Sequence, residues 1–223
     1  MQTCGMFRDR TDAGRQLAEM VARRLAHPSG PPGVEGGLVL GLPRGGVPVA
    51  ALVADTLGVP LDVLVVRKIG VPWQPELALG AVGERGVVVL NADVVSACGV
   101  GPDELDALIR RGSQEVQDVV GQLRPAARPL DVTGRMAIVV DDGVATGATA
   151  RAAAGVLRQS GSGPVVLAAP VAALSTCESL RSCFDEVICI MTPRRFGSVG
   201  QYYEQFDQVS IAHVRQVLER SSA

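Results

Sequence analysis

The sequence is poor in the residues on which several classes of protein depend. Its five cysteines include no C-x-x-C pair and histidine occurs only twice, so neither a zinc site nor a disulfide framework is expected. An excess of positive charge is also missing, because 21 basic residues face 23 acidic ones, for a net charge of −2. Binding of nucleic acid through bulk charge is therefore not expected.

Long apolar stretches are missing as well. The longest uncharged stretch, residues 159–177, is interrupted by Pro164 and Pro170 and does not have the continuous apolar character of a membrane span. The N-terminal residues contain no apolar core of signal-peptide length. We therefore expect a cytoplasmic protein without a membrane partner.

The 223 residues are 47% hydrophobic and 20% charged. This composition is typical of a packed globular protein, and the length suits a single domain. Short apolar runs predict strands at residues 38–42, 61–66, 86–91, 136–140, 165–171 and 186–191. Between and around them, apolar residues at helical spacing predict helices at residues 12–26, 47–57, 102–123, about 150–159, 175–182 and 210–220. Strands that alternate with helices predict an α/β fold, in which helices cover both faces of a parallel sheet.

Three local details accompany this assignment. Thr11 or Asp12 is expected to cap the first helix and Ser210 the last. Residues 70–85 contain Pro72, Pro75 and several glycines, and are expected to form a loop with little fixed structure of its own. In parallel sheets of this kind ligands bind beyond the carboxyl ends of the strands, which directs attention to the segments that follow them.

The most informative of those segments is VVDDGVATGATA, residues 139–150. An apolar run leads into two carboxylates, Asp141 and Asp142, and then into a loop of small residues that precedes a helix. Small residues allow backbone amides to surround an anion at a helix N-terminus, and threonine hydroxyls add donors. A bare phosphate site leaves the carboxylates unexplained, because they would repel the anion. A sugar phosphate accounts for both, since carboxylates accept hydrogen bonds from ribose hydroxyls while the loop takes the phosphate.

This segment resembles the motif with which type I phosphoribosyltransferases bind phosphoribosyl pyrophosphate (PRPP). The alternative interpretation is a solvated acidic turn between a strand and a helix. A turn of that kind does not explain why a dozen consecutive positions match the motif. Gly143 departs from the motif, in which an apolar residue is usual. The resemblance implies that PRPP is bound by Asp141, Asp142, Val144, Ala145, Thr146, Gly147, Ala148 and Thr149.

A second segment, GLPRGGVPVA at residues 41–50, resembles the pyrophosphate loop of the same family. By itself PRGG is only a tight turn, but its place after the first predicted strand and the presence of the other motif favour the loop. Gly45 and Gly46 would let backbone amides approach the leaving pyrophosphate, and Arg44 would add charge. The resemblance also implies a cis peptide bond between Pro43 and Arg44.

Lys68 is the only lysine, since 20 of the 21 basic residues are arginine. Together with Arg67 it ends the second predicted strand, where many family members place a cationic pair. A solvated surface pair is an equally good interpretation of these two residues alone. The loop 70–85, which includes Trp73 and Glu76, resembles the mobile loop that closes over PRPP in this family, although Trp73 could equally contact a partner subunit.

Four of the chain's seven aromatic residues lie within 11 positions, at Phe196, Tyr202, Tyr203 and Phe206. Such clustering usually produces a small local core, and this interpretation is slightly favoured. In purine-type phosphoribosyltransferases, however, an aromatic residue of a C-terminal hood stacks on the base. By that resemblance Phe196, with Val144, is the candidate for contact with the base.

The resemblance further implies the architecture of the whole chain. It implies a PRPP-type α/β domain that occupies residues 1–223, with a core of about 36–192. A small hood would be built from the chain termini, about 1–27 and 193–223. A homo-oligomer, in the first instance a homodimer, is also expected.

The implied reaction is attack by a nitrogen of a small-molecule acceptor, a nucleobase in the first instance, on the anomeric carbon of PRPP. Asp141 and Asp142 would hold the ribose ring beside a developing positive charge, while Arg44, Arg67 and Lys68 would stabilise the departing pyrophosphate. Mg²⁺ would be held mainly by PRPP, with Asp141 and Asp142 as the protein groups that could contribute, and no dedicated protein site is expected.

The sequence limits the range of possible acceptors but does not identify one. In 6-oxopurine phosphoribosyltransferases an Asp two residues before the motif glycine is the proposed proton acceptor, and here that position is Ala145. An alanine cannot accept a proton, so adenine-like acceptors, and with them purine salvage, rank above hypoxanthine and guanine. An amine that is not a nucleobase stays open.

Two other classes of function compete with this interpretation. A PRPP-sensing regulator of the same fold would not catalyse, and one acting on nucleic acid should carry a basic face or an added DNA-binding segment. A hydrolase that releases phosphate from a sugar phosphate would need a positioned base or a metal cluster. Neither signature is found in the sequence.

Overall fold

The computed structural model describes residues 6–27, 35–124 and 131–221. In this part of the chain, parallel strands form a central five-stranded sheet in the order β2-β1-β6-β7-β8. The strands are β1 (Leu38–Gly41), β2 (Leu61–Val63), β6 (Ala137–Val140), β7 (Val165–Val171) and β8 (Glu186–Met191). The predicted α/β class with a parallel sheet is thereby confirmed.

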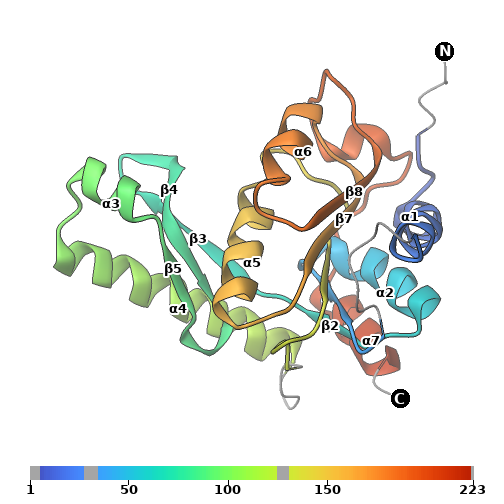
Figure 1. Ribbon diagram of the computed structural model, residues 1–223, viewed down its shortest axis with the longest axis horizontal. Coiled ribbons are helices and arrows are strands. Elements are labelled where there is room, and N and C mark those ends of the chain that lie inside the picture. Colours follow the sequence, from blue (N-terminus) through green and yellow to red (C-terminus); the bar gives the residue numbers. More distant parts are fainter. Residues whose placement is uncertain (1–5, 28–34, 125–130, 222–223) are drawn as a thin grey trace.

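Helices cover both faces of the central sheet, as predicted, because successive strand residues point to opposite sides. Val39, Ile138 and Val166 join one apolar core with helices α1 (Arg10–Leu25), α2 (Gly46–Leu57) and α7 (Ile211–Ser221). Their neighbours Leu38 and Ala137 join a second core with helices α5 (Ala148–Gln159) and α6 (Leu174–Leu180). Figure 1 shows α1, α2 and α7 on one side of the sheet and α5 on the other. No helix among the described residues has both the length and the apolar character needed to cross a membrane.

Residues 66–123 form a projection from the central sheet, which we call the arm (Figure 1). It contains a second, antiparallel sheet of β3 (Val66–Val71), β4 (Gln74–Gly83) and β5 (Val88–Leu90). Its helical elements are η1 (Glu84–Gly86), α3 (Ala92–Cys98) and α4 (Pro102–Leu123). The sequence predicted α4 at its observed place but no helix at α3.

The expectation that residues 70–85 lack fixed structure was wrong, because they form most of the β3–β4 hairpin. Glycines stand where the strands approach too closely for a side chain. A Cβ atom at Gly80 would lie 2.2 Å from the Val89 carbonyl oxygen, and one at Gly70 would lie 2.7 Å from that of Pro75. The register shifts on both sides of Gly70, so glycine and proline accommodate an irregular hairpin here instead of ending it.

Two boundaries also differ from the prediction. The predicted strand 61–66 is divided between β2 and β3, so Arg67 and Lys68 lie inside β3 and not at the end of the second strand. Helix α1 begins earlier than expected, because Asp9 and neither Thr11 nor Asp12 is its N-cap, with the Asp9 carboxylate accepting from the Asp12 amide at 2.8 Å.

The N-terminal and C-terminal segments of the described chain pair with each other. The Phe7 amide donates to the Tyr202 carbonyl oxygen at 2.9 Å, and the Phe7 carbonyl oxygen accepts from the Glu204 amide at 2.8 Å. The short helix η2 (Val199–Tyr202) precedes this contact, and Ser210 caps α7 as predicted, accepting from the His213 amide at 3.1 Å. We call residues 6–9 with 193–209 the hood; the predicted hood limits of 1–27 and 193–223 stay a prediction, and residues 1–5, 222 and 223 lie outside the described part.

Candidate functional site

The two segments singled out in the sequence meet at the carboxyl edge of the central sheet. Residues 42–45 connect β1 to α2, which begins at Gly46, and residues 141–147 connect β6 to α5. Since β1 and β6 are parallel neighbours, their following loops leave the sheet side by side. The Leu42 amide donates to the Val140 carbonyl oxygen at 2.8 Å, which extends the strand pairing into this edge.

Glycine is required where the two loops touch. A Cβ atom at Gly45 would lie 1.9 Å from Oδ2 of Asp142, and one at Gly46 would lie 2.5 Å from the Val140 carbonyl oxygen. No side chain fits at either position without displacing the carboxylate segment. The peptide bond between Pro43 and Arg44 is cis, as the family resemblance implied.

Asp141 lies at the turn that follows β6. Its Oδ1 accepts from the Asp142 amide at 2.9 Å, which bends the chain so that the two adjacent carboxylates need not point to opposite faces. Burial, followed by the negative charge of Asp142, raises the pKa of Asp141 well above the usual aspartate value. The site thus holds a carboxyl group that would gain from hydroxyl donors or a cation.

Asp142 is held by residues of α1 and the hood that the sequence analysis missed. Nε of Arg10 donates to Oδ2 of Asp142 at 2.8 Å, and the Tyr203 hydroxyl donates to the Asp142 carbonyl oxygen at 2.6 Å. No signal in the sequence pointed to Arg10, because the predicted helix began at residue 12 and the carboxylate that pairs with Arg10 lies 132 positions away.

The unusual Gly143 has a structural explanation in the hood. A Cβ atom at this position would lie 2.4 Å from Cγ1 of Val199 and 3.1 Å from Cγ1 of Val171. Val199 therefore occupies the space in which the family motif places its own apolar side chain. The motif and the hood are packed together at this point, and the departure from the pattern is compensated by a residue 56 positions away.

The loop that leads into α5 has the geometry of an anion site. Gly147 is the N-cap of α5 with φ +73°, and no side chain caps the helix, so the amides of its first turn lack an intrahelical acceptor. The loop's carbonyl oxygens are held by other groups. The Thr176 hydroxyl donates to the Ala145 carbonyl oxygen at 2.7 Å, and Arg151 donates to that of Thr146 at 3.0 Å.

The predicted cations lie on both sides of this loop. Arg44 and Arg67 line a cavity of about 270 Å³ together with Thr149. Lys68 lines a larger cavity of about 630 Å³, between the arm and α5, together with Thr146. The structure thus brings both predicted segments and all three predicted cations to one region, although Nε of Arg67 also lies 3.5 Å from a carboxylate oxygen of Glu115 on α4.

Phe196 is engaged within the hood. Its ring stacks on Tyr202 with centroids 5.4 Å apart and an interplanar angle of 22°. Nearby, Tyr203 packs against Phe7 at 5.4 Å and against Phe206 at 4.8 Å. The aromatic cluster forms a small core of its own, which was the slightly favoured interpretation.

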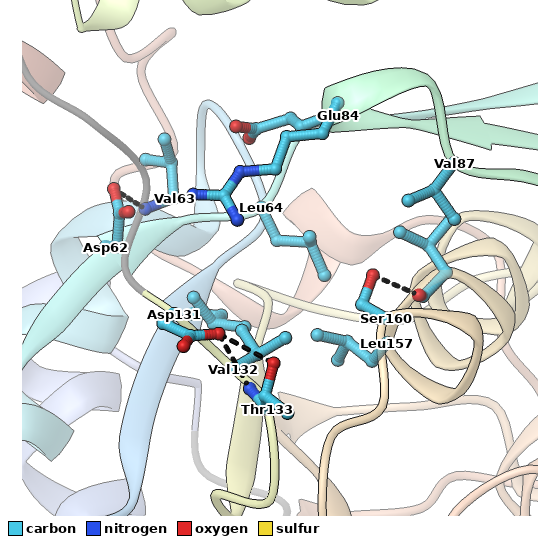
Figure 2. A pocket seen from close by; sticks show the side chains of 13 residues that line it. Asp62, Val63, Leu64, Glu84, Val87, Asp131, Val132, Thr133, Leu157 and Ser160 are labelled. Atoms are coloured by element: carbon cyan, nitrogen blue, oxygen red, sulfur yellow. Dashed lines mark hydrogen bonds between the residues drawn. The ribbon is translucent and has the colours of Figure 1, made fainter.

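A third cavity, of about 210 Å³, lies beside the far end of α5 (Figure 2) and is lined mostly by apolar residues, with three carboxylates among them. These carboxylates are engaged by neighbouring groups. Asp62 and Glu84 pair with Arg124, and Asp131 accepts from the amide and hydroxyl of Thr133. A helix of 12 residues is about 18 Å long, so this cavity is remote from the loop that begins α5, and we assign it no ligand.

Comparisons with known proteins agree with this arrangement. The family model described as a phosphoribosyl transferase domain matches residues 15–206. Proteins of Mycobacterium tuberculosis strains H37Rv and CDC 1551, provisionally named phosphoribosyl transferases, are 50% identical over 216 residues. That alignment covers 97% of this chain and 47% of the relatives, so the chain spans about half the length of the curated proteins it matches.

Solved structures support the fold. The crystal structure of TT1426 from Thermus thermophilus has a TM-score of 0.87 and 40% sequence identity, covering 96% of this chain and 98% of that one. The AQ2163 protein from Aquifex aeolicus has a TM-score of 0.50 at 11% identity, covering 86% of this chain and 78% of that one. The second likeness concerns the fold alone.

Proposed function

Because this chain belongs to the phosphoribosyltransferase family, we propose that it transfers ribose 5-phosphate from PRPP to a nitrogen acceptor and releases pyrophosphate. One observation carries the proposal. The Gly45–Gly46 turn packs directly against Asp141 and Asp142, at the sheet edge where the N-terminus of α5 also lies. Arg44 and Arg67 line one cavity beside α5, and Lys68 lines another. A phosphate, a ribose and a pyrophosphate each have a complementary group there.

The proposed donor lies along this edge. The 5-phosphate is proposed to take the loop from Val144 to Thr149 at the N-terminus of α5, where backbone amides and the threonine hydroxyls would donate. The Val144 amide is not among these donors, because it donates to the Val171 carbonyl oxygen at 2.8 Å. The ribose hydroxyls donate to Asp141 and to Asp142. The pyrophosphate is proposed to lie against the backbone of the Gly45–Gly46 turn, whose side-chain positions are taken by Asp142 and by the Val140–Asp141 segment.

The same site would stabilise the charges that develop during the reaction. Loss of pyrophosphate leaves positive charge on the ribose ring, which the carboxylates of Asp141 and Asp142 stabilise, while Arg44, Arg67 and Lys68 stabilise the departing group. Mg²⁺ bound with PRPP would neutralise pyrophosphate oxygens. Asp141 is the protein carboxylate best suited to approach that ion, because Oδ2 of Asp142 already accepts from Arg10.

An adenine-like base is the proposed acceptor, with a role in purine salvage. Ala145 leaves the loop without a side chain that could take a proton from a 6-oxopurine. Phe196 is proposed to contact the base with the face that Tyr202 does not cover. Val144, the other predicted contact, is only 3% exposed and packs in the core beneath α5 and α6, so its side chain is not available to the base. Efficient turnover of hypoxanthine would contradict this ranking of acceptors.

We also propose that the enzyme is a cytoplasmic homodimer that acts on small molecules. Trp73, with 62% of its surface exposed at the turn between β3 and β4, is a candidate contact for the second subunit.

The experiment that tests the function is a screen of nitrogen acceptors with PRPP and Mg²⁺, following pyrophosphate release. We expect release that depends on both the acceptor and PRPP, and that is lost in Asp141→Asn. PRPP binding without release for any acceptor would instead identify a sensing regulator of the same fold. Absence of PRPP binding would contradict both.

A further inference from the structure

Arg10 makes three contacts that join α1, the hood and the carboxylate segment. Its Nε donates to Oδ2 of Asp142 at 2.8 Å, and one terminal nitrogen donates to the Asp207 carbonyl oxygen at 2.7 Å. Its guanidinium carbon lies 3.9 Å from the centre of the Phe206 ring. The planar fork of an arginine can satisfy all three at once, which an ammonium group cannot.

The contact with Asp142 is well shielded from water. Both side chains keep only 13% of their surface exposed, so the pair is screened far less than a surface ion pair. Asp142 is also confined from the opposite side, because Gly45 leaves just enough space for Oδ2. The orientation of this carboxylate is therefore set by Arg10 on one side and by the glycine turn on the other.

These contacts give the two carboxylate oxygens of Asp142 different roles. Oδ2 is occupied by Arg10, which leaves Oδ1 to accept from a ligand. We propose that Arg10 is a positioning residue for ribose recognition, which acts by holding Asp142 so that Oδ1 meets a sugar hydroxyl. This assignment rests on the proposed function, since it takes the ligand to be a ribose phosphate.

The same contacts connect the hood to the sugar. The Tyr203 hydroxyl holds the backbone of Asp142, and Phe206 and Asp207 hold Arg10. A sugar hydroxyl bound to Asp142 thus adds to a network whose other members are Arg10 of α1 and three residues of the hood. Recognition of the ribose and placement of the hood are coupled through one carboxylate.

The test compares binding of ribose 5-phosphate with that of its 2-deoxy and 3-deoxy analogues, by calorimetry. The proteins are the wild type, Arg10→Met, Asp142→Asn and the double variant, with Arg15→Met as the control, since Arg15 is an exposed residue of the same helix. We expect the wild type and the control to prefer ribose 5-phosphate over at least one analogue by about tenfold, the effect of one charge-assisted hydrogen bond.

In Arg10→Met this preference should fall below about threefold, and the double variant should equal Asp142→Asn, because Arg10 acts through Asp142. A general loss of stability would weaken binding of both ligands, so it would leave the ratio of their affinities unchanged. Arg10→Lys provides a second variant that keeps the charge, and its preference should also fall.

Several results would overturn the assignment. An unchanged preference in folded Arg10→Met or Arg10→Lys would do so, as would additive effects of Arg10→Met and Asp142→Asn. Either result leaves the proposed function standing if the wild type still binds PRPP with Mg²⁺. Failure of the wild type to bind PRPP would remove the proposed function, and this assignment with it.

Discussion

Gly45 carries the strictest steric requirement of any single residue in the site. A Cβ atom there would lie 1.9 Å from Oδ2 of Asp142, so Gly45→Ala must displace the carboxylate, the turn or both. We expect a loss of about 1–3 kcal/mol in the free energy of unfolding, together with loss of PRPP binding. Chemical denaturation and calorimetry measure the two effects.

A matched control for this substitution lies in the arm. Gly121 is exposed in α4. Apart from its chain neighbours and its own helix backbone, no atom of the described residues lies within 4 Å of the Cβ that would be added. Gly121→Ala should stabilise the protein by up to about 1 kcal/mol and leave PRPP binding intact. If Gly45→Ala behaved like the control, the close contact between the two loops would be refuted.

Asp141 is expected to make the fold less stable as pH rises. Burial raises its pKa in the folded protein, whereas in the unfolded chain it ionises near pH 3.9. As pH rises above that value the unfolded chain loses its proton first, so stability falls by about 1.4 kcal/mol for each unit by which the folded pKa is raised. Asp141→Asn should therefore unfold at a higher temperature than the wild type at pH 7, yet fail to bind PRPP.

The control for this prediction is pH itself. At about pH 3.5, where Asp141 is protonated in both states, the stability advantage of the variant should largely disappear. Thermal unfolding at a series of pH values follows the difference. If the stability advantage of the variant did not change with pH, burial of the ionised Asp141 carboxylate would not be what destabilises the wild type.

Lys68 should tolerate conservative change poorly. It lies opposite Ala81 within the β3–β4 hairpin and lines the cavity beside Thr146. An ammonium is a compact charge on a flexible stem, while a guanidinium is a wide fork. In single-turnover kinetics Lys68→Arg should keep most of the PRPP affinity but lose at least about tenfold in rate, and Lys68→Ala should lose both. Full activity of Lys68→Arg would make the single lysine an accident of composition.

Among the elements, the β3–β4 hairpin differs most from what its sequence indicates. Glycine and proline within residues 70–85 are the usual markers of a loop, and nothing local distinguishes a loop from strands that need glycine at close approaches. By contrast, β6 and β7 are continuous apolar runs buried on both faces, and such runs are recognisable from sequence alone. Patterning predicts an element well where burial is uniform and poorly where the partner strand imposes the constraint.

The hairpin also offers a reporter of its own movement. Trp73 is the only tryptophan in the chain and lies exposed at the turn between β3 and β4. If the hairpin closes over PRPP, as the family resemblance implies, its fluorescence should shift to shorter wavelength when PRPP and Mg²⁺ are added. Trp73→Phe should bind PRPP as the wild type does. Binding detected by calorimetry without any change in emission would argue against closure.

At the scale of the whole molecule, the candidate site is assembled from distant parts of the sequence. The two motifs were recognisable because each is local. Their contact arises because β1 and β6 are neighbours in the sheet, an order that the sequence did not predict. The pairing of Arg10 with Asp142, 132 residues apart, and the filling of Gly143 by Val199 were not recognisable either, because no local pattern links a residue of α1 or of the hood to the strand end that it covers. These contacts depend on how the two ends of the chain meet.

The central claim is that the two loops together form a site for a ribose phosphate carrying a pyrophosphate. Calorimetric titration of the wild type and of Asp142→Asn with PRPP and Mg²⁺ tests it most directly. A hydrogen bond to a charged group contributes about 1.5–3 kcal/mol, so the variant should bind PRPP at least about tenfold more weakly than the wild type. Equal affinities of the two proteins, or no binding by the wild type, would contradict the account.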